Sequence, residues 1–323
     1  MAYVAGDTIL DDEYQTFVAS SSDPYGWNHF AGTGAGQYGL GQTHLVEVTP
    51  NATTITAAQW NALLTGMANV GSHTNDSLTA RTAVTAGDTI GIKAAIVADL
   101  ASLAAEVAGG STSATALTTS SALQTVTTGS EGWDSTATQE VSVTFANANN
   151  MRFFFNGGGK VRITVGTVQA ATSSKDQSFI DLGTALGNID INSLTTTRSG
   201  SGETLTSNGL ANGFQDLTTS YTSLIKLTSD NSNYTGNTVE IFAKTTGGNG
   251  NSGNATVLTI KMVATDGAGD TQFTDGNLNS VAVAAKDTPK MRTTLFTLTP
   301  STAQGLDPIY GISASAAVSN TVS

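Results

Sequence analysis

The chain has 323 residues, which is enough to bury a substantial hydrophobic core in one to three domains. Its 13 Lys and Arg residues against 25 Asp and Glu residues give a formal net charge of −12, which argues against binding of a nucleic-acid phosphate backbone. The absence of cysteine from the sequence excludes disulfide bonds and cysteine-ligated metals.

Only 12% of the residues are charged, whereas the share in soluble proteins is roughly 25%. Hydrophobic residues nevertheless make up 39% of the chain and follow regular patterns, unlike those of disordered proteins. This composition is typical of extracellular assemblies and fibres. Since no run reaches the ~20 apolar residues that span a bilayer, and the first residues lack an export signal, we expect synthesis in the cytosol without membrane insertion.

The first predicted element is a short helix over residues 7–17, capped by Asp7. A glycine-rich loop follows, and its Gly34, Gly36 and Gly39 have the spacing of a dinucleotide-binding fingerprint. We reject that function because no hydrophobic strand precedes the loop and no amphipathic helix follows it directly. We expect the aromatic residues of the loop to pack against a neighbouring subunit or docking partner. They are Tyr25, Trp27, Phe30 and Tyr38.

A helix is predicted over residues 54–70. Thr56 and Gln59 have the spacing of a capping box, and Gly71 is a typical stop signal. The apolar residues recur at the i, i+3, i+4 and i+7 positions of one helix face. They are Trp60, Leu63, Leu64 and Met67.

A longer helix is predicted over residues 88–108. Its apolar residues are spaced 4, 4, 3 and 4 apart, close to a heptad seam, and its other faces are mostly alanine. This pattern allows an intrachain bundle or a short homo-oligomeric bundle, and we favour the second. The residues of the stripe are Ile92, Ile96, Leu100, Leu103 and Val107.

Residues 111–135 are rich in Ser and Thr and are predicted to be a linker or an extended surface segment. After residue 136 the hydrophobic period becomes 2, which is typical of strands. We interpret residues 150–165 as a β-hairpin with its turn at Asn156–Gly159. A small helix is expected at residues 179–186. Further strands are expected at residues 221–227, 239–244, 257–264, 281–285 and 294–299.

The predicted fold class is therefore mainly β. An N-terminal helical docking and oligomerisation region, residues 1–110, precedes the linker at residues 111–135. Residues 136–323 are expected to form an antiparallel β-sandwich of jelly-roll-like type, because many short strands alternate with Gly, Asn and Asp turns.

Catalytic and metal-binding patterns are weak in this sequence. The histidines lack metal-ligand spacing, and no GxSxG nucleophile elbow occurs. One loop carries Asp266, Asp270 and Asp275, but the EF-hand order is missing, so turn formation is the favoured interpretation. We expect no enzyme activity, catalytic residue, cofactor or metal site. The histidines are His29, His44 and His73.

Several segments together resemble virion structural proteins of tailed bacteriophages, especially marine and cyanobacterial ones. They are the opening MAYVAGDTILDDEYQTF, YGLGQT at residues 38–43, the helix with Gln59, Trp60 and Asn61, and AGDTIGIKAAIVADLASLAAE at residues 86–106. In the second half they are RFFFNGGGKVRITV at residues 152–165 and the later LTTSYTSLIKL and VLTIKMVATD. The segment RFFFNGGGKVRITV is similar to a hairpin of that family. Its matching residues are Arg152, Phe154, Phe155, Asn156, Gly157, Gly158 and Arg162.

The resemblance implies a structural role in the virion, made in the host cytoplasm and released by lysis. We expect an oligomeric tail or neck fibre-like appendage, a homotrimer, docked through its N-terminal part to virion proteins of the neck, tail or capsid. The expected interface residues are Trp27, Tyr38, Trp60, Leu64, Ile96, Leu100 and Leu103.

Three alternatives stay open. The first is a capsid decoration protein. The second is a receptor-binding module that holds a host-surface glycan, which an exposed aromatic patch around Phe153–Phe155 or Tyr221 would support. The third is a depolymerase, which requires two carboxylates facing each other across a cleft.

Overall fold

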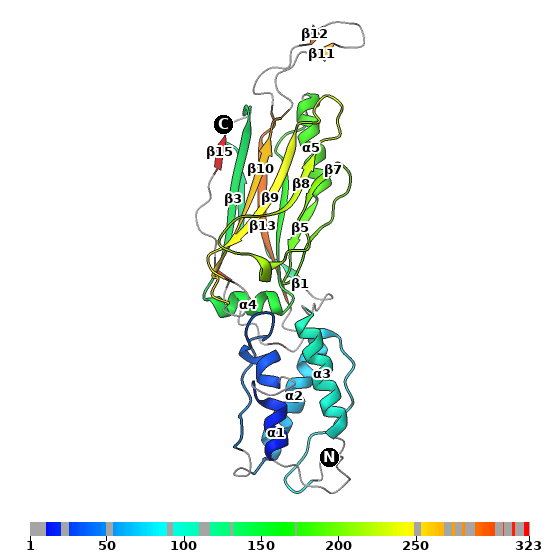
Figure 1. Cartoon of the computed structure of the whole chain (residues 1–323), viewed down its shortest axis with the longest axis vertical. Coiled ribbons are helices and arrows are strands. Elements are labelled where there is room, and N and C mark those ends of the chain that lie inside the picture. The colour runs from blue at the N-terminus through cyan, green and yellow to red at the C-terminus, as the bar shows by residue number, and fades with distance from the viewer. Residues whose placement is uncertain are drawn as a thin grey trace.

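A computed structural model of the chain shows a mainly β protein with two antiparallel sheets and a few helices, compatible with a β-sandwich. Figure 1 shows an elongated molecule in which α1, α2 and α3 gather at one end and both sheets lie at the other. The structure describes residues 11–20, 26–49, 54–88, 93–109, 117–129, 132–171, 173–248, 253–267, 273–274, 280–281, 288–300, 306, 312–313 and 320–322.

We call residues 11–109 the helical region. Its described residues form four helical segments and a second hydrophobic core, to which Leu306 also contributes. Both long helices predicted from the sequence are confirmed. The short helix predicted at residues 7–17 is seen from Asp11 on, and its predicted cap, Asp7, lies outside the described residues. None of the described helices combines the length and the apolar content needed to cross a membrane. The segments are α1 (Asp11–Val18), η1 (Asn28–Thr33), α2 (Ala57–Thr74) and α3 (Lys93–Ala108).

Helix α2 begins at the predicted capping box. The Thr56 side chain accepts a hydrogen bond from the backbone N–H of Gln59 at 3.2 Å, and the Gln59 side chain accepts one from the Thr56 N–H at 2.9 Å. The helix does not stop at Gly71 as predicted. It ends at Asn75, whose left-handed φ of 60° terminates the helix, and Gly71 instead provides space for the side chain of Leu78.

The predicted β-hairpin at residues 150–165 is wrong in its first half, because residues 148–156 form helix α4 (Ala148–Asn156). Asn147 caps this helix through the N–H of Asn150. The helix turns Met151, Phe154 and Phe155 towards the β core. These positions have the i, i+3 and i+4 spacing of a helix face, but the run of aromatic residues is also typical of a strand. The second half of the prediction is confirmed by strand β4 (Lys160–Thr167).

Six strands form the first sheet, in the order β1-β13-β4-β5-β6 with β2 also paired to β13. All of these pairings are antiparallel. The long central strand β13 contains the strand predicted at residues 294–299. The bounds are β1 (Leu117–Thr119), β2 (Gln124–Thr127), β13 (Met291–Pro300), β5 (Asn188–Ile191) and β6 (Thr196–Arg198).

Seven strands form the second sheet, in the order β14-β3-β10-β9-β8-β7 with β15 also paired to β3. It contains the strands predicted at residues 221–227, 239–244 and 257–264. The bounds are β3 (Thr136–Phe145), β7 (Thr204–Asn208), β8 (Thr222–Thr228), β9 (Thr238–Thr245), β10 (Val257–Thr265), β14 (Ile312–Ser313) and β15 (Asn320–Val322).

A separate two-stranded ladder pairs β11 (Phe273–Thr274) with β12 (Ser280–Val281). It lies beyond the ends of the two sheets, at the pole of the molecule away from the helices (Figure 1). Only the first residue of the strand predicted at residues 281–285 falls in β12, and the rest lie outside the described residues.

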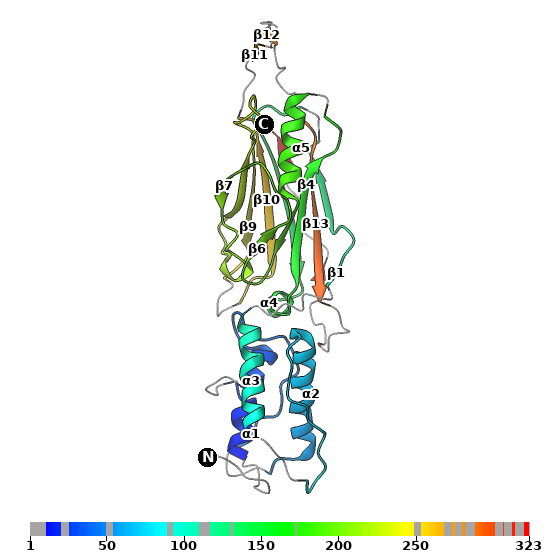
Figure 2. The same ribbon diagram turned by 90° about the vertical axis from the view of Figure 1, so that its right-hand side faces the viewer.

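The buried residues of both sheets belong to one hydrophobic core, which also includes one face of α4. Helix α5 (Ser174–Leu186) lies alongside the two sheets (Figure 2) and buries Phe179 and Leu182 in that core. It begins five residues before the predicted helix at 179–186, because Ser173 and Asp176 form a capping box. The short 3-10 helix η2 (Phe214–Asp216) adds Phe214.

The predicted linker at residues 111–135 is wrong where the structure describes it. Strands β1 and β2 in this stretch pair with β13, so the Ser- and Thr-rich sequence is used as sheet edge. Trp133 is buried, donates its ring N–H to the Pro289 carbonyl at 3.1 Å and packs edge-on against Phe179. The segment therefore belongs to the β region, which we define as residues 117–300 together with strands β14 and β15.

Replacing Trp133 tests this correction. We expect Trp133→Ala to lower the free energy of unfolding by about 3–5 kcal/mol, because it leaves a large cavity in the core. The control Ser121→Ala, on an exposed residue of the same stretch, is expected to stay within about 0.5 kcal/mol. Urea denaturation followed by tryptophan fluorescence and circular dichroism measures both values, and equal stability of the two variants would restore the linker interpretation.

Candidate functional site at the junction of the helical and β regions

The residues expected at an interface between subunits lie mostly inside the single chain. Trp60 is 2% exposed, and the same core of the helical region also buries Trp27, Ile96, Leu100 and Leu103. These side chains present too little surface for a second chain to contact, so the expected interface is corrected for them. The buried residues are Trp27, Trp60, Ile96, Leu100 and Leu103, while Tyr38 and Leu64 are partly buried against them.

The apolar stripe of α3 packs against α2 and η1. Its described members, Ile96 to Val107, are buried there without another subunit. The intrachain bundle is therefore the arrangement seen, and the favoured homo-oligomeric bundle is not needed to cover the stripe. Ile92 lies outside the described residues.

Helix α4 lies at the boundary between the helical and β regions (Figure 1) and presents a polar face to the loop after η1. Arg152 and Asn156 are one helical turn apart, so both side chains lie on that face. The Asn156 side-chain amide donates to the backbone carbonyls of Gly36, Tyr38 and Gly39 at 3.1, 2.7 and 3.0 Å. One fully buried amide thus shares its two N–H hydrogens among three carbonyls of a single loop.

The Arg152 guanidinium binds the same loop. It donates to the Tyr38 carbonyl at 2.8 Å and to the Thr33 carbonyl at 3.1 Å, and it lies 4.8 Å from the centroid of the Phe153 ring. The side chain is 4% exposed, and burial lowers the pKa of Arg152 from its ordinary value. A buried charge of this kind is stabilised when carbonyl dipoles replace the lost water.

The oxygen of the Asn156 amide extends the contact into the β region. It accepts from the Gln215 side chain at 3.1 Å, and Gln215 also donates to the Gly36 carbonyl at 3.3 Å. Gln215 belongs to η2, whose neighbour Phe214 stacks on Phe155 of α4 with ring centroids 4.2 Å apart. The polar contact with the loop is therefore anchored directly to the aromatic core of the β region.

Close packing of backbone and ring completes the loop contact. Gly41 has a φ of +73°, and a Cβ atom there would lie 2.5 Å from a ring carbon of Phe153. Both the backbone conformation and the lack of space thus require glycine at this position.

A second contact joins α2 to the end of α4. His73, which is fully buried, bonds through Nε2 to the Gly157 carbonyl at 2.8 Å. Because a carbonyl only accepts, Nε2 carries the hydrogen. Nδ1 has no hydrogen-bond partner among the described residues, and burial lowers the pKa of His73 despite the bond to Gly157. The ring is thus held in its neutral form.

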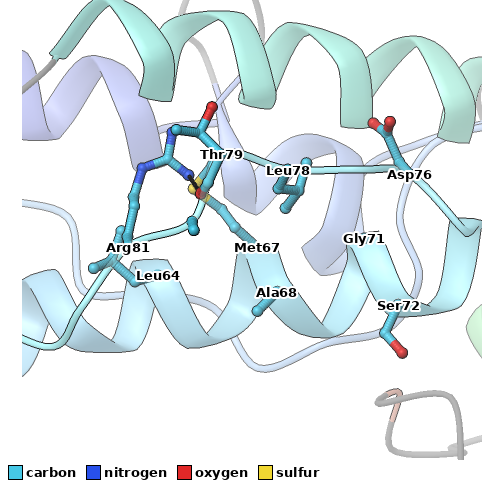
Figure 3. A pocket seen from close by; sticks show the side chains of 10 residues that line it. Leu64, Met67, Ala68, Gly71, Ser72, Asp76, Leu78, Thr79 and Arg81 are labelled. Carbon is cyan, nitrogen blue, oxygen red and sulfur yellow. Dashed lines mark hydrogen bonds between the residues drawn. The ribbon is translucent and has the colours of Figure 1, made fainter.

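The cavity in Figure 3, of about 360 Å³, lies between α2 and the chain that follows it. Leu64, Met67 and Leu78 give it apolar walls. Arg81 at one end pairs with Asp99 at 2.5 Å, and Asp76 at the other end accepts a hydrogen bond from Ser102 at 2.7 Å. The charged groups at its rim are thus occupied by α3.

The residues that could bind a metal ion, catalyse a reaction or stack on a sugar do not gather in one place among the described residues. Within the part of the chain that the structure describes, no cluster of His, Asp and Glu has the arrangement of a metal site. The Asp266 carboxylate pairs with the buried ammonium of Lys175, while Asp270 and Asp275 lie outside the described residues. Phe153, Phe154 and Phe155 are buried, so the aromatic patch expected there for a glycan is excluded.

Comparison with known proteins gives no relative for this chain. No protein-family description matches it, and neither a curated protein nor a solved structure matches.

Replacing Gly41 tests the close contact with Phe153. We expect Gly41→Ala to lower the free energy of unfolding by at least about 1 kcal/mol more than Gly87→Ala, since overpacking adds to the cost of the positive φ. Gly87 is a matched control because its φ is +96° and no atom lies near the position of its Cβ. Chemical denaturation of both variants measures the difference, and equal values would contradict the packing described here.

Acidification is expected to weaken the junction through His73. Its folded-state pKa lies below the ordinary 6.5, so the unfolded chain binds more protons as the pH falls. Stability is therefore full above about pH 7.5, begins to fall near pH 6.5 and levels off below the lowered pKa.

His73→Gln keeps a donor for Gly157 but does not titrate, so we expect a smaller loss of stability between pH 7.5 and pH 5. His29, whose pKa is also lowered by burial and by Arg152, contributes separately, and His29→Gln serves as the comparison. Denaturant titrations at both pH values decide the matter. An unchanged pH dependence in His73→Gln would refute the assignment.

Proposed function

We propose that this chain is a non-enzymatic structural component of a tailed-phage virion. In this proposal it is an oligomeric tail or neck fibre-like appendage, docked to other virion proteins by its helical region. The observation that carries the proposal is the junction, where buried Arg152 and Asn156 direct their hydrogen bonds to the backbone of another part of the same chain. Such contacts hold two cores in one orientation, as an elongated appendage requires.

The junction also gives a physical reason for the sequence resemblance. The segment YGLGQT supplies the carbonyls of Tyr38 and Gly39 and the close contact at Gly41. The segment RFFFN supplies Arg152 and Asn156, which bind them. Two of the segments that resemble phage virion proteins are therefore the two sides of one contact, and this supports a shared architecture.

A homotrimer remains part of the proposal, with a surface other than the buried stripe of α3. Val46, 66% exposed, and Val97, 42% exposed, are apolar side chains of the helical region available for such a contact. We further propose that the two sheets form a jelly-roll-like sandwich at the end of the appendage away from its docking site. The protein is made in the host cytoplasm and released with the particle by lysis.

Immunogold electron microscopy of purified particles of the phage that encodes this chain tests the proposal. We expect label at the tail or neck, removed when the antiserum is pre-absorbed with the purified protein. Label spread over the head would favour the alternative of a capsid decoration protein, and particles without label would refute a virion role.

Light scattering of the purified chain tests the oligomeric part separately. We expect a mass three times that of one chain, and we expect Val97→Asp to reduce it because a charge would be buried in the contact. The variant Val46→Asp shows in the same way whether the second exposed valine lies in the contact between subunits. A single-chain mass for the unaltered protein would contradict the trimer.

The alternative of a receptor- or glycan-binding module has one observation in its favour. Tyr221, named above as a test of that alternative, lies half-buried on a sheet face together with Phe242 and two lysines.

A further inference from the structure

The outer face of the seven-stranded sheet carries side chains that differ from the Thr and Ser typical of this chain. In β9 the residues Val239, Ile241 and Ala243 face the core, and Glu240, Phe242 and Lys244 alternate with them. The alternation places these three side chains on the opposite, outward face. An aromatic ring between two charged residues on such a face is suited to contact a ligand.

The strand register assembles a row of such residues across four strands. Lys261 of β10 lies opposite Phe242 of β9 and, on its other side, opposite Glu140 of β3. Ser223 of β8 lies opposite Phe242. Cross-strand partners on one face lie within reach of each other, so the row forms a continuous surface.

Tyr221 lies across this row. Its hydroxyl donates to the Glu140 carboxylate at 2.7 Å, while its ring centroid lies 4.3 Å from the Lys244 ammonium and 4.0 Å from the Lys261 ammonium. The Phe242 ring meets it edge-on at 6.3 Å. Burial and the bond to Glu140 raise the pKa of Tyr221, so the hydroxyl stays protonated and can donate to Glu140. We call Glu140, Tyr221, Phe242, Lys244 and Lys261 the Tyr221 face.

The charge of this face differs from that of the chain. The whole sequence has 13 Lys and Arg residues and a net charge of −12, yet two ammonium groups meet at one ring. Lys226 pairs with Glu240 at 3.4 Å. Neither Lys244 nor Lys261 forms an ion pair with a carboxylate among the described residues, so both remain available to an anion.

We propose that the Tyr221 face binds an acidic saccharide, such as a uronic acid in a polysaccharide. The sugar carboxylate lies between Lys244 and Lys261, which the rings of Tyr221 and Phe242 hold in place, and sugar hydroxyls donate to Glu140. A nucleic acid fits less well, since a phosphodiester group has no hydroxyl to donate to Glu140 and is repelled by that carboxylate. Because binding is measured on the purified chain, the proposal does not rest on a virion role.

Isothermal titration calorimetry of the full chain tests the proposal with three probes of similar length. They are tetragalacturonate, the neutral maltotetraose and a single-stranded tetranucleotide. We expect tetragalacturonate to bind at least tenfold more tightly than either other probe, and to bind more weakly as salt is added. Equal or tighter binding of maltotetraose or of the nucleotide would overturn the proposal, and so would no binding of tetragalacturonate.

Matched variants place the site. The double variant Lys244→Gln with Lys261→Gln, and separately Tyr221→Leu, are expected to weaken tetragalacturonate binding at least tenfold. Lys160→Gln is the control, because Lys160 is a half-buried strand lysine of the other sheet. A loss of the same size in the control, or no loss in the two test variants, would place the site elsewhere.

A measurement on the unaltered chain tests the proposal even if the variants fail to fold. Acetylation of lysines, followed by peptide mass spectrometry, is expected to slow at Lys244 and Lys261 when tetragalacturonate is present, and to stay unchanged at Lys160. Equal acetylation rates at Lys244 and Lys261 with and without the saccharide would overturn the proposal.

Discussion

The contact between the Asn156 amide and three carbonyls of one loop is the interaction on which the arrangement of the two regions depends. Each hydrogen bond contributes only about 1 kcal/mol net, but a buried polar group left without a partner costs about 1–3 kcal/mol. Any other orientation of the helical region would leave Arg152, Asn156 and the loop carbonyls unpaired. The junction therefore favours one orientation because every other orientation leaves buried polar groups without partners. The stability of each region itself comes from its hydrophobic core.

The parts of the fold that the sequence predicted are those with strong local patterns. The capping box at Thr56 and the alternation in β9 and β10 are local, and the structure has them. The segments at residues 117–127 and 148–156 depend on distant partners. The first pairs with β13, and the second places aromatic residues in a core built by strands far along the chain. Tertiary contacts override local propensity in both places.

The candidate site was only partly visible in the sequence. The spacing of Arg152 and Asn156, with Asn147 as a cap, carries a helical signal that the aromatic run concealed. The contact with the loop at residues 33–41 joins segments more than 100 positions apart, which no local pattern encodes. The apolar stripe of α3 was recognised, but a stripe alone does not say whether its partner belongs to the same chain. Tyr221 was identified, whereas its lysine neighbours required the strand register.

The distance between the two regions in solution tests the central claim most directly. The chain has no cysteine, so Ala101→Cys in α3 and Leu205→Cys in β7, both at exposed positions, can each carry one spin label. Double electron–electron resonance should give a single narrow distance distribution, measured with labelled protein diluted in unlabelled protein. The same labels in an Asn156→Leu background should give a broad one. A broad distribution in the protein with Asn156 intact would contradict a junction that fixes the two regions.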